Sequence, residues 1–116
     1  MNRPTPVAFK TSDGIVLAAD RYGARGRGSV ILAHGGGQTR HAWAKTASAL
    51  ADREWEVIAL DLRGHGDSAW APDGNYDMNA YVYDFAQLVH TLGYDQVTIV
   101  AHSLGGNVSG RFTGLY

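Results

Sequence analysis

Three short apolar runs, separated by two stretches with helical periodicity, constrain the fold of this chain more than any other feature. The runs are residues 30–33, 56–60 and 97–101. Each has the length of one strand, and apart from Glu56 and Thr98 each is apolar without regular alternation, which is typical of a strand buried on both faces. The sequence therefore predicts three strands in the middle of a sheet.

The stretches between these runs predict two amphipathic helices. In residues 41–53, apolar side chains recur at i, i+4 and i+7, namely Trp43, Ala47 and Leu50. The second stretch repeats this spacing with Tyr81, Phe85, Leu88 and Leu92, and Asp77 is placed to cap that helix. Parallel strands cannot be joined by a tight turn, so the alternation of strands and helices predicts an α/β fold with a parallel sheet and crossover helices.

An antiparallel hairpin is expected ahead of the parallel strands. Residues 7–10 and 15–20 flank Asp13-Gly14, a dipeptide that favours a tight hairpin turn. Residues 21–28 then form a polar, glycine-rich connection. No linker divides the sequence, so residues 1–116 are expected to form a single domain.

Charge and composition exclude several classes of partner. The 116 residues carry 10 basic and 11 acidic groups, a formal net charge of −1 that offers no field to concentrate phosphates, which argues against nucleic acid. No apolar stretch is long enough to span a membrane, and the first residues carry no export signal, so a cytoplasmic location is expected. The sequence shows no metal-binding cluster, and neither a metal nor a cofactor is expected.

Glycine marks one edge of the predicted sheet. Seven of the 15 glycines follow the three predicted strands directly: Gly35, Gly36, Gly37, Gly64, Gly66, Gly105 and Gly106. Ligands of open parallel sheets bind beyond the carboxyl ends of the strands, where glycine permits sharp turns and close approach of the backbone. We therefore expect the functional site at this edge.

The segment after the third strand is typical of a nucleophile on a sharp turn. A serine between a strand and a helix needs small residues two positions before and after it, and Ala101 and Gly105 flank Ser103 in this way. The free N–H groups at the helix start would favour negative charge beside it. Ser103 is the candidate nucleophile, with a plain helix N-cap as the alternative.

The segment after the first strand is a candidate oxyanion-binding loop. Acyl transfer requires backbone N–H groups aimed at the oxygen that becomes negative. His34-Gly35-Gly36-Gly37 ends a predicted strand and could supply such a group, although a flexible loop is the other interpretation.

These two segments, together with Asp61-Leu62-Arg63-Gly64-His65-Gly66-Asp67-Ser68, resemble the α/β-hydrolase superfamily in order and spacing. The resemblance covers the whole chain, and the one departure is Ala101, where the G-x-S-x-G motif has glycine. It implies an α/β-hydrolase fold. It also implies that Ser103 attacks a carbonyl and that the N–H groups of Gly36 and Leu104 bind the oxyanion, with His34, Gly35 and Gly37 as the supporting loop. Either Gly35 or Gly37 could replace Gly36. Arg63 and Asp67 are expected to be structural.

The function that the resemblance implies is a serine hydrolase acting on a small acyl substrate such as an ester. A cofactor-free perhydrolase of the haloperoxidase kind would use the same serine with peroxide, and a non-catalytic ligand-binding protein on this fold is a further alternative. Dehalogenases and epoxide hydrolases would have aspartate at position 103. Residues 64–69 formally match a dinucleotide-binding fingerprint, but a loop, not a helix, follows them.

The acid and base of the triad are missing from the sequence. In this superfamily they follow the nucleophile, yet residues 104–116 contain no Asp, Glu or His. We therefore expect an N-terminal portion that ends after the nucleophile helix and lacks the C-terminal strands, the cap and both triad partners. Such a piece would be inactive alone, and the open edge of strand 97–101 could lead to self-association.

Overall fold

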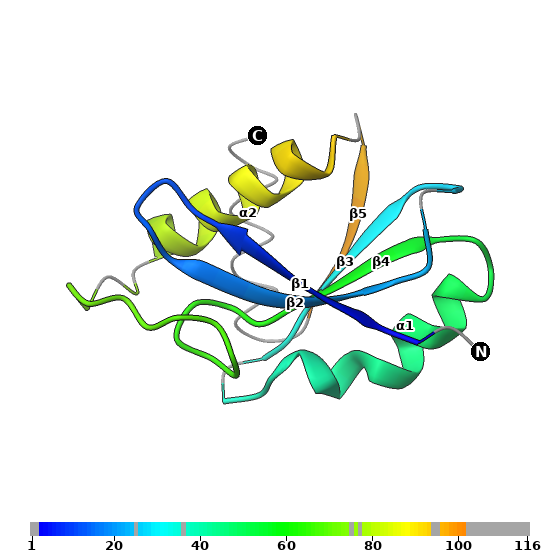
Figure 1. Cartoon of the computed structure of the whole chain (residues 1–116), viewed down its shortest axis with the longest axis horizontal. Helices are drawn as coiled ribbons and strands as arrows, with labels where there is room; N and C mark the ends of the chain where they lie inside the picture. The colour runs from blue at the N-terminus through cyan, green and yellow to red at the C-terminus, as the bar shows by residue number, and fades with distance from the viewer. Residues whose placement is uncertain are drawn as a thin grey trace.

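The computed structural model describes residues 3–24, 26–35, 37–74, 76, 78–93 and 96–101. In these residues a five-stranded mixed sheet has the order β1-β2-β4-β3-β5 (Figure 1). Its strands are β1 Thr5–Lys10, β2 Val16–Tyr22, β3 Ser29–Ala33, β4 Glu56–Leu60 and β5 Val97–Ala101. The helices are the 3₁₀ helix η1 Arg40–Trp43, α1 Ala44–Ala51 and α2 Met78–Leu92.

The predicted N-terminal hairpin is confirmed. β1 pairs antiparallel with β2, and Gly14 in the turn has a φ of +87°, a left-handed conformation that glycine adopts without strain. β2 is longer than the expected residues 15–20, because it also pairs antiparallel with β4 and places Tyr22 opposite Val57. The first residues of the expected polar connection therefore belong to the sheet.

β3 pairs in parallel with both β4 and β5, as the crossover helices require. Ala33, the last residue of β3, lies opposite Leu60 on one side and Ala101 on the other. All residues of β3 and β4 are buried, which confirms the interpretation of their apolar runs. The carboxyl ends of all three strands meet at one edge of the sheet.

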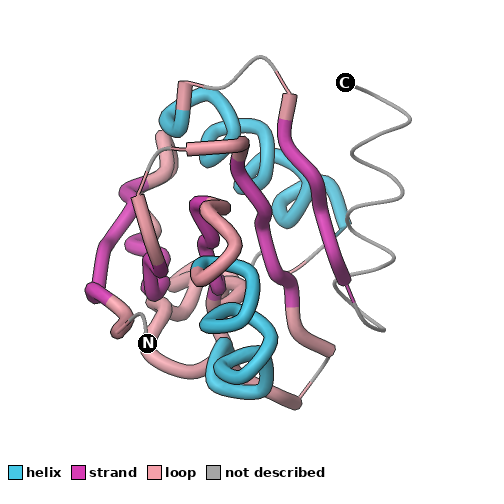
Figure 2. Tube along the Cα trace, turned by 90° about the vertical axis from the view of Figure 1, so that its right-hand side faces the viewer, coloured by secondary structure: helices cyan, strands magenta, loops and turns pink. Residues whose placement is uncertain are grey.

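β5 is less buried than its sequence indicates. Thr98 and Val100 are exposed, whereas the alternate residues on the other face are half-buried. Among the described residues β5 pairs with β3 alone, so it forms an edge of the sheet (Figure 2). The prediction of burial on both faces is therefore wrong for this strand, because no described element covers its outer face or its free edge.

Both predicted helices are present, and the bounds of the first differ from the prediction. The first begins as the 3₁₀ helix η1 and continues as α1, which ends at Ala51 and not at residue 53. Glu54 has a φ of 72°, and its N–H donates to the carbonyl of Ala51 at 3.0 Å. This left-handed residue ends the helix and turns the chain into β4. Asp77, the expected cap of α2, lies outside the described residues.

The two helices cover opposite faces of the sheet (Figure 1). On the α2 face, Ile31, Ile58 and Phe85 belong to one buried apolar cluster. On the α1 face, Leu32 and Ala47 belong to a second. Each fully buried Ile, Leu or Phe side chain contributes about 1.5–3 kcal/mol relative to exposure, so the sheet is a rigid base for the loops at its carboxyl edge. Among the described residues, no helix is both long enough and apolar enough to span a membrane.

Candidate active site

The candidate site consists of loops at the carboxyl edge of the sheet. The loop after β3 carries three of the predicted site residues within the described part of the chain, namely His34, Gly35 and Gly37. The other three, Gly36, Ser103 and Leu104, lie outside the described residues. The loop after β4, residues 61–68, lies against the first of these loops.

His34 joins the two loops through both of its ring nitrogens. Its side chain is fully buried, Nδ1 lies 2.8 Å from the Gly35 carbonyl oxygen, and Nε2 lies 3.0 Å from the Leu62 backbone nitrogen. Because Leu62 N–H can only donate, Nε2 must be the acceptor and Nδ1 carries the proton. Gln38 adds two bonds: its Oε1 accepts from Gly35 N–H, and its own N–H donates to the Gly35 carbonyl. These contacts argue against a flexible loop at its described residues.

Burial lowers the pKa of His34, and the hydrogen bond to the Gly35 carbonyl only partly opposes this effect. A proton on Nε2 would also remove the acceptor for Leu62 N–H. His34 is therefore a neutral, structural imidazole in the folded protein.

The free energy of unfolding is expected to fall as the pH drops below about 6.5, because the unfolded state then protonates His34 while the folded state resists the proton. For this one group, the free energy of unfolding should change by up to about 1.4 kcal/mol per pH unit. Urea unfolding of the full-length protein at pH 7.5 and 5.5, with His34→Gln for comparison, measures this change. The variant should lose less stability between the two pH values than the wild type. An equal loss in both proteins would mean that His34 does not couple folding to pH.

Asp61 anchors the loop after β4. It directly follows the strand, is fully buried, and accepts the backbone N–H of Arg40 at 2.6 Å and that of Asp67 at 3.0 Å. The Arg40 guanidinium also pairs with Asp61, with Asp67 and with Asp20. A Cβ at Gly66 would overlap the Asp61 carboxylate, so glycine is required there. This network fixes the loop after β4 to η1, the helix that follows the His34 loop.

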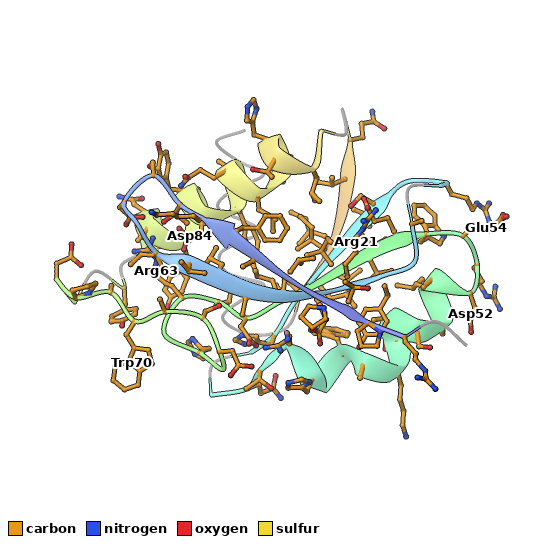
Figure 3. The ribbon with its side chains drawn as sticks, in the orientation of Figure 1. Arg21, Asp52, Glu54, Arg63, Trp70 and Asp84 are labelled. Carbon is orange, nitrogen blue, oxygen red and sulfur yellow. The ribbon has the colours of Figure 1, made fainter. Side chains whose placement is uncertain are left out.

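Arg63 ties the same loop to two more elements. Its buried guanidinium donates to both carboxylate oxygens of Asp84 on α2, at 2.7 and 2.8 Å, and to Asp13 in the hairpin turn at 3.1 Å. Figure 3 shows Arg63 and Asp84 side by side at this junction. Burial raises the pKa of Asp84, against the opposing influence of Arg63. The contacts of Arg63 are those of a structural residue, as expected from the sequence.

A pocket of about 320 Å³ opens beside these loops. It is lined by Arg63, Gly64, His65, Trp70, Tyr76 and Tyr81. The sequence does not mark Tyr76, which follows a turn, as a pocket residue, and the helical spacing of Tyr81 indicates only a core position. Of the described residues, no group of three His, Asp or Glu side chains is arranged to hold a metal ion.

Known proteins are similar to this chain in sequence. Residues 28–116 match the family model described as alpha/beta hydrolase fold. An esterase of Mycobacterium tuberculosis is 33% identical over 115 residues, covering 99% of this chain and 37% of the esterase. The non-heme chloroperoxidase CPO-A1 of Kitasatospora aureofaciens is 36% identical over 104 residues, covering 90% of this chain and 37% of that protein.

Solved structures agree with the sequence comparisons. The crystal structure of epoxide hydrolase A from Mycobacterium thermoresistibile superposes with a TM-score of 0.88 at 30% identity, covering 98% of this chain and 36% of that one. The chain thus spans about a third of the length of the proteins it matches. With the strand order, the loops at the carboxyl edge and the family match in agreement, the chain belongs to the alpha/beta hydrolase fold family.

Proposed function

We propose that the protein is a serine hydrolase that cleaves esters or related acyl compounds. Ser103 is the nucleophile, and the N–H groups of Gly36 and Leu104 bind the oxyanion. The observation that carries this proposal is the register of two parallel strands, in which Ala33 of β3 lies opposite Ala101 of β5.

This register makes the segments that follow β3 and β5 begin at neighbouring points of the sheet edge. Neighbouring strands lie about 4.8 Å apart, so Ala33 and Ala101, the last residues of β3 and β5, lie side by side at the carboxyl edge of the sheet. Gly35 and Ser103 each stand two positions beyond a paired strand end. A hydroxyl and a loop with free N–H groups would thereby come together, which is the arrangement that acyl transfer needs.

The hydrogen bonds of the loop after β3 also support this role. The Gly35 carbonyl accepts from both His34 and Gln38, so the described residues of this loop are held before any substrate arrives. Preorganised donors stabilise developing charge without having to reorient during the reaction. His34 thus acts as a positioning residue and not as the general base, because its burial keeps it away from a substrate.

The reaction would proceed in two steps, acylation of Ser103 and hydrolysis of the acyl-enzyme. Ser103 Oγ attacks the carbonyl carbon while a general base takes its proton, and that proton passes to the leaving alcohol as the C–O bond breaks. Water then attacks the acyl-enzyme, releases the acid and returns the proton to Ser103. The base and its carboxylate partner would come from a part of the protein beyond residues 1–116.

A second candidate uses the same serine with hydrogen peroxide in place of water, which would release a peracid. The similarity to a non-heme chloroperoxidase favours it. Epoxide opening is less favoured, although an epoxide hydrolase superposes well, because this chain has serine at position 103, where that reaction would need aspartate.

A substrate panel on the full-length protein separates these reactions. We expect hydrolysis of p-nitrophenyl acetate, followed at 405 nm, and no conversion of styrene oxide to its diol by chromatography. Peracetic acid formed from acetate and hydrogen peroxide would establish the second candidate beside the first. Diol formation without any ester cleavage would contradict the proposal.

A further inference from the structure

The pocket beside the candidate active site is lined mainly by aromatic side chains. Three of its walls are aromatic rings, those of Trp70, Tyr76 and Tyr81. Trp70 is 74% exposed and projects outward two positions beyond the loop of residues 61–68 (Figure 3). The Tyr76 ring of the same pocket is 38% exposed, and aromatic side chains gathered around one hollow are typical of small-molecule sites, whereas single exposed ones are common on protein surfaces.

The tyrosine hydroxyls of this pocket are already used within the protein. The Tyr76 hydroxyl accepts the Ala71 N–H at 2.8 Å, and that of Tyr81 lies 3.4 Å from the Arg63 carbonyl oxygen. Gly64 packs against the Tyr76 ring so closely that a Cβ there would overlap it. The rings are therefore held in place within the pocket wall.

The charge in the pocket is also balanced internally. Arg63 lines it, but its guanidinium is bonded to Asp84 and Asp13. A carboxylate ligand would find no unmatched cation in Arg63, because its two carboxylate partners offset its charge. The remaining attraction is for an uncharged ring, since aromatic pairs gain about 0.5–1.5 kcal/mol beyond the area they bury.

The pocket adjoins the loop of the proposed reaction. His65 forms part of its wall, and the His65 ring lies 5.0 Å, centroid to centroid, from the ring of His34. His34 is bonded to Gly35 in the proposed oxyanion-binding loop. The His65 side chain thus lies between the aromatic pocket and that loop. The volume of the pocket is at the lower end of the range for small-molecule sites.

We propose that this pocket binds an uncharged aryl group of the substrate, with Trp70 as the residue that determines specificity. This inference rests on the proposed function, because it assigns a substrate class to the same site. It makes the preferred substrates esters with an aromatic ring in the acyl or alcohol part.

Trp70→Ala tests this assignment without disturbing the core, because the side chain is mostly exposed. In the full-length protein, kcat/KM for ethyl phenylacetate should fall about tenfold, while that for ethyl acetate should change less than twofold, both measured by pH-stat titration. Tyr83→Ala is the matched control, since Tyr83 is a 48% exposed aromatic residue of α2 that does not line the pocket. It should leave the ratio of the two kcat/KM values unchanged.

Binding provides a second measurement that does not depend on turnover. Calorimetric titration with phenylacetamide should show about tenfold weaker binding to Trp70→Ala than to the wild type. Ester hydrolysis with no Trp70-dependent selectivity would overturn the aryl pocket and leave the reaction standing. Trp70-dependent binding without ester hydrolysis would overturn the proposed reaction and leave the aryl pocket standing. If neither is observed, both proposals are overturned.

Discussion

Ser103→Ala is expected to lower kcat for ester hydrolysis by the full-length protein by on the order of 10⁴-fold or more, because loss of a serine nucleophile removes the acyl-enzyme route. The KM should change little, since the hydroxyl contributes mainly to the transition state. Initial rates with p-nitrophenyl acetate measure both values, and far-UV circular dichroism confirms that the fold is retained.

The control for this variant is Ser48→Ala, which removes a hydroxyl from α1 on the sheet face opposite α2. It should retain the wild-type kcat. If Ser103→Ala keeps more than a tenth of the wild-type turnover, Ser103 is not the nucleophile, and its position is that of a helix cap.

Asp61→Ala is expected to destabilise the full-length protein by about 3–5 kcal/mol, because it removes the most buried of three counterions of Arg40 and leaves buried backbone donors without an acceptor. Arg40 would lose its most buried partner, and the backbone N–H groups of Arg40 and Asp67 would lose their acceptor. Urea unfolding followed by tryptophan fluorescence measures the change in free energy of unfolding.

Asp67→Ala is the matched comparison. Asp67 also pairs with Arg40, but its side chain is 74% exposed, and exposed ion pairs contribute at most about 1 kcal/mol. The difference between the two variants isolates the effect of burial. If they destabilise the protein equally, the Asp61 network does not anchor the loop after β4.

The layered part of the fold could be predicted from the sequence because it depends on local periodicity. The apolar runs of β3 and β4 require burial on both faces, and the i, i+4, i+7 pattern of α2 places Phe85 in the core. The described glycines Gly35, Gly37, Gly64 and Gly66 follow β3 and β4 at the carboxyl edge of the sheet, as expected, and the assignment of this edge as the functional site stays a prediction. These features are written within single segments, so a short window of sequence reveals them.

Contacts between distant segments could not be predicted in this way. Arg40 and Asp61 are 21 positions apart, and nothing in either segment indicates that they pair. The burial of β5 depends on which strands and helices lie against it, so its composition alone overestimated that burial. The aromatic pocket combines a loop with a helix, and the periodicity of Tyr81 indicated only a core position. The predicted roles of Gly36, Ser103 and Leu104 stay predictions.

The most direct test of the account is the site of a covalent adduct. The full-length protein is incubated with a fluorophosphonate, digested, and analysed by tandem mass spectrometry. The account predicts a phosphonyl group on Ser103, and no labelling of the Ser103→Ala variant. Equal labelling of the variant, or an adduct mapped to another serine, would contradict the assignment of Ser103 as the nucleophile.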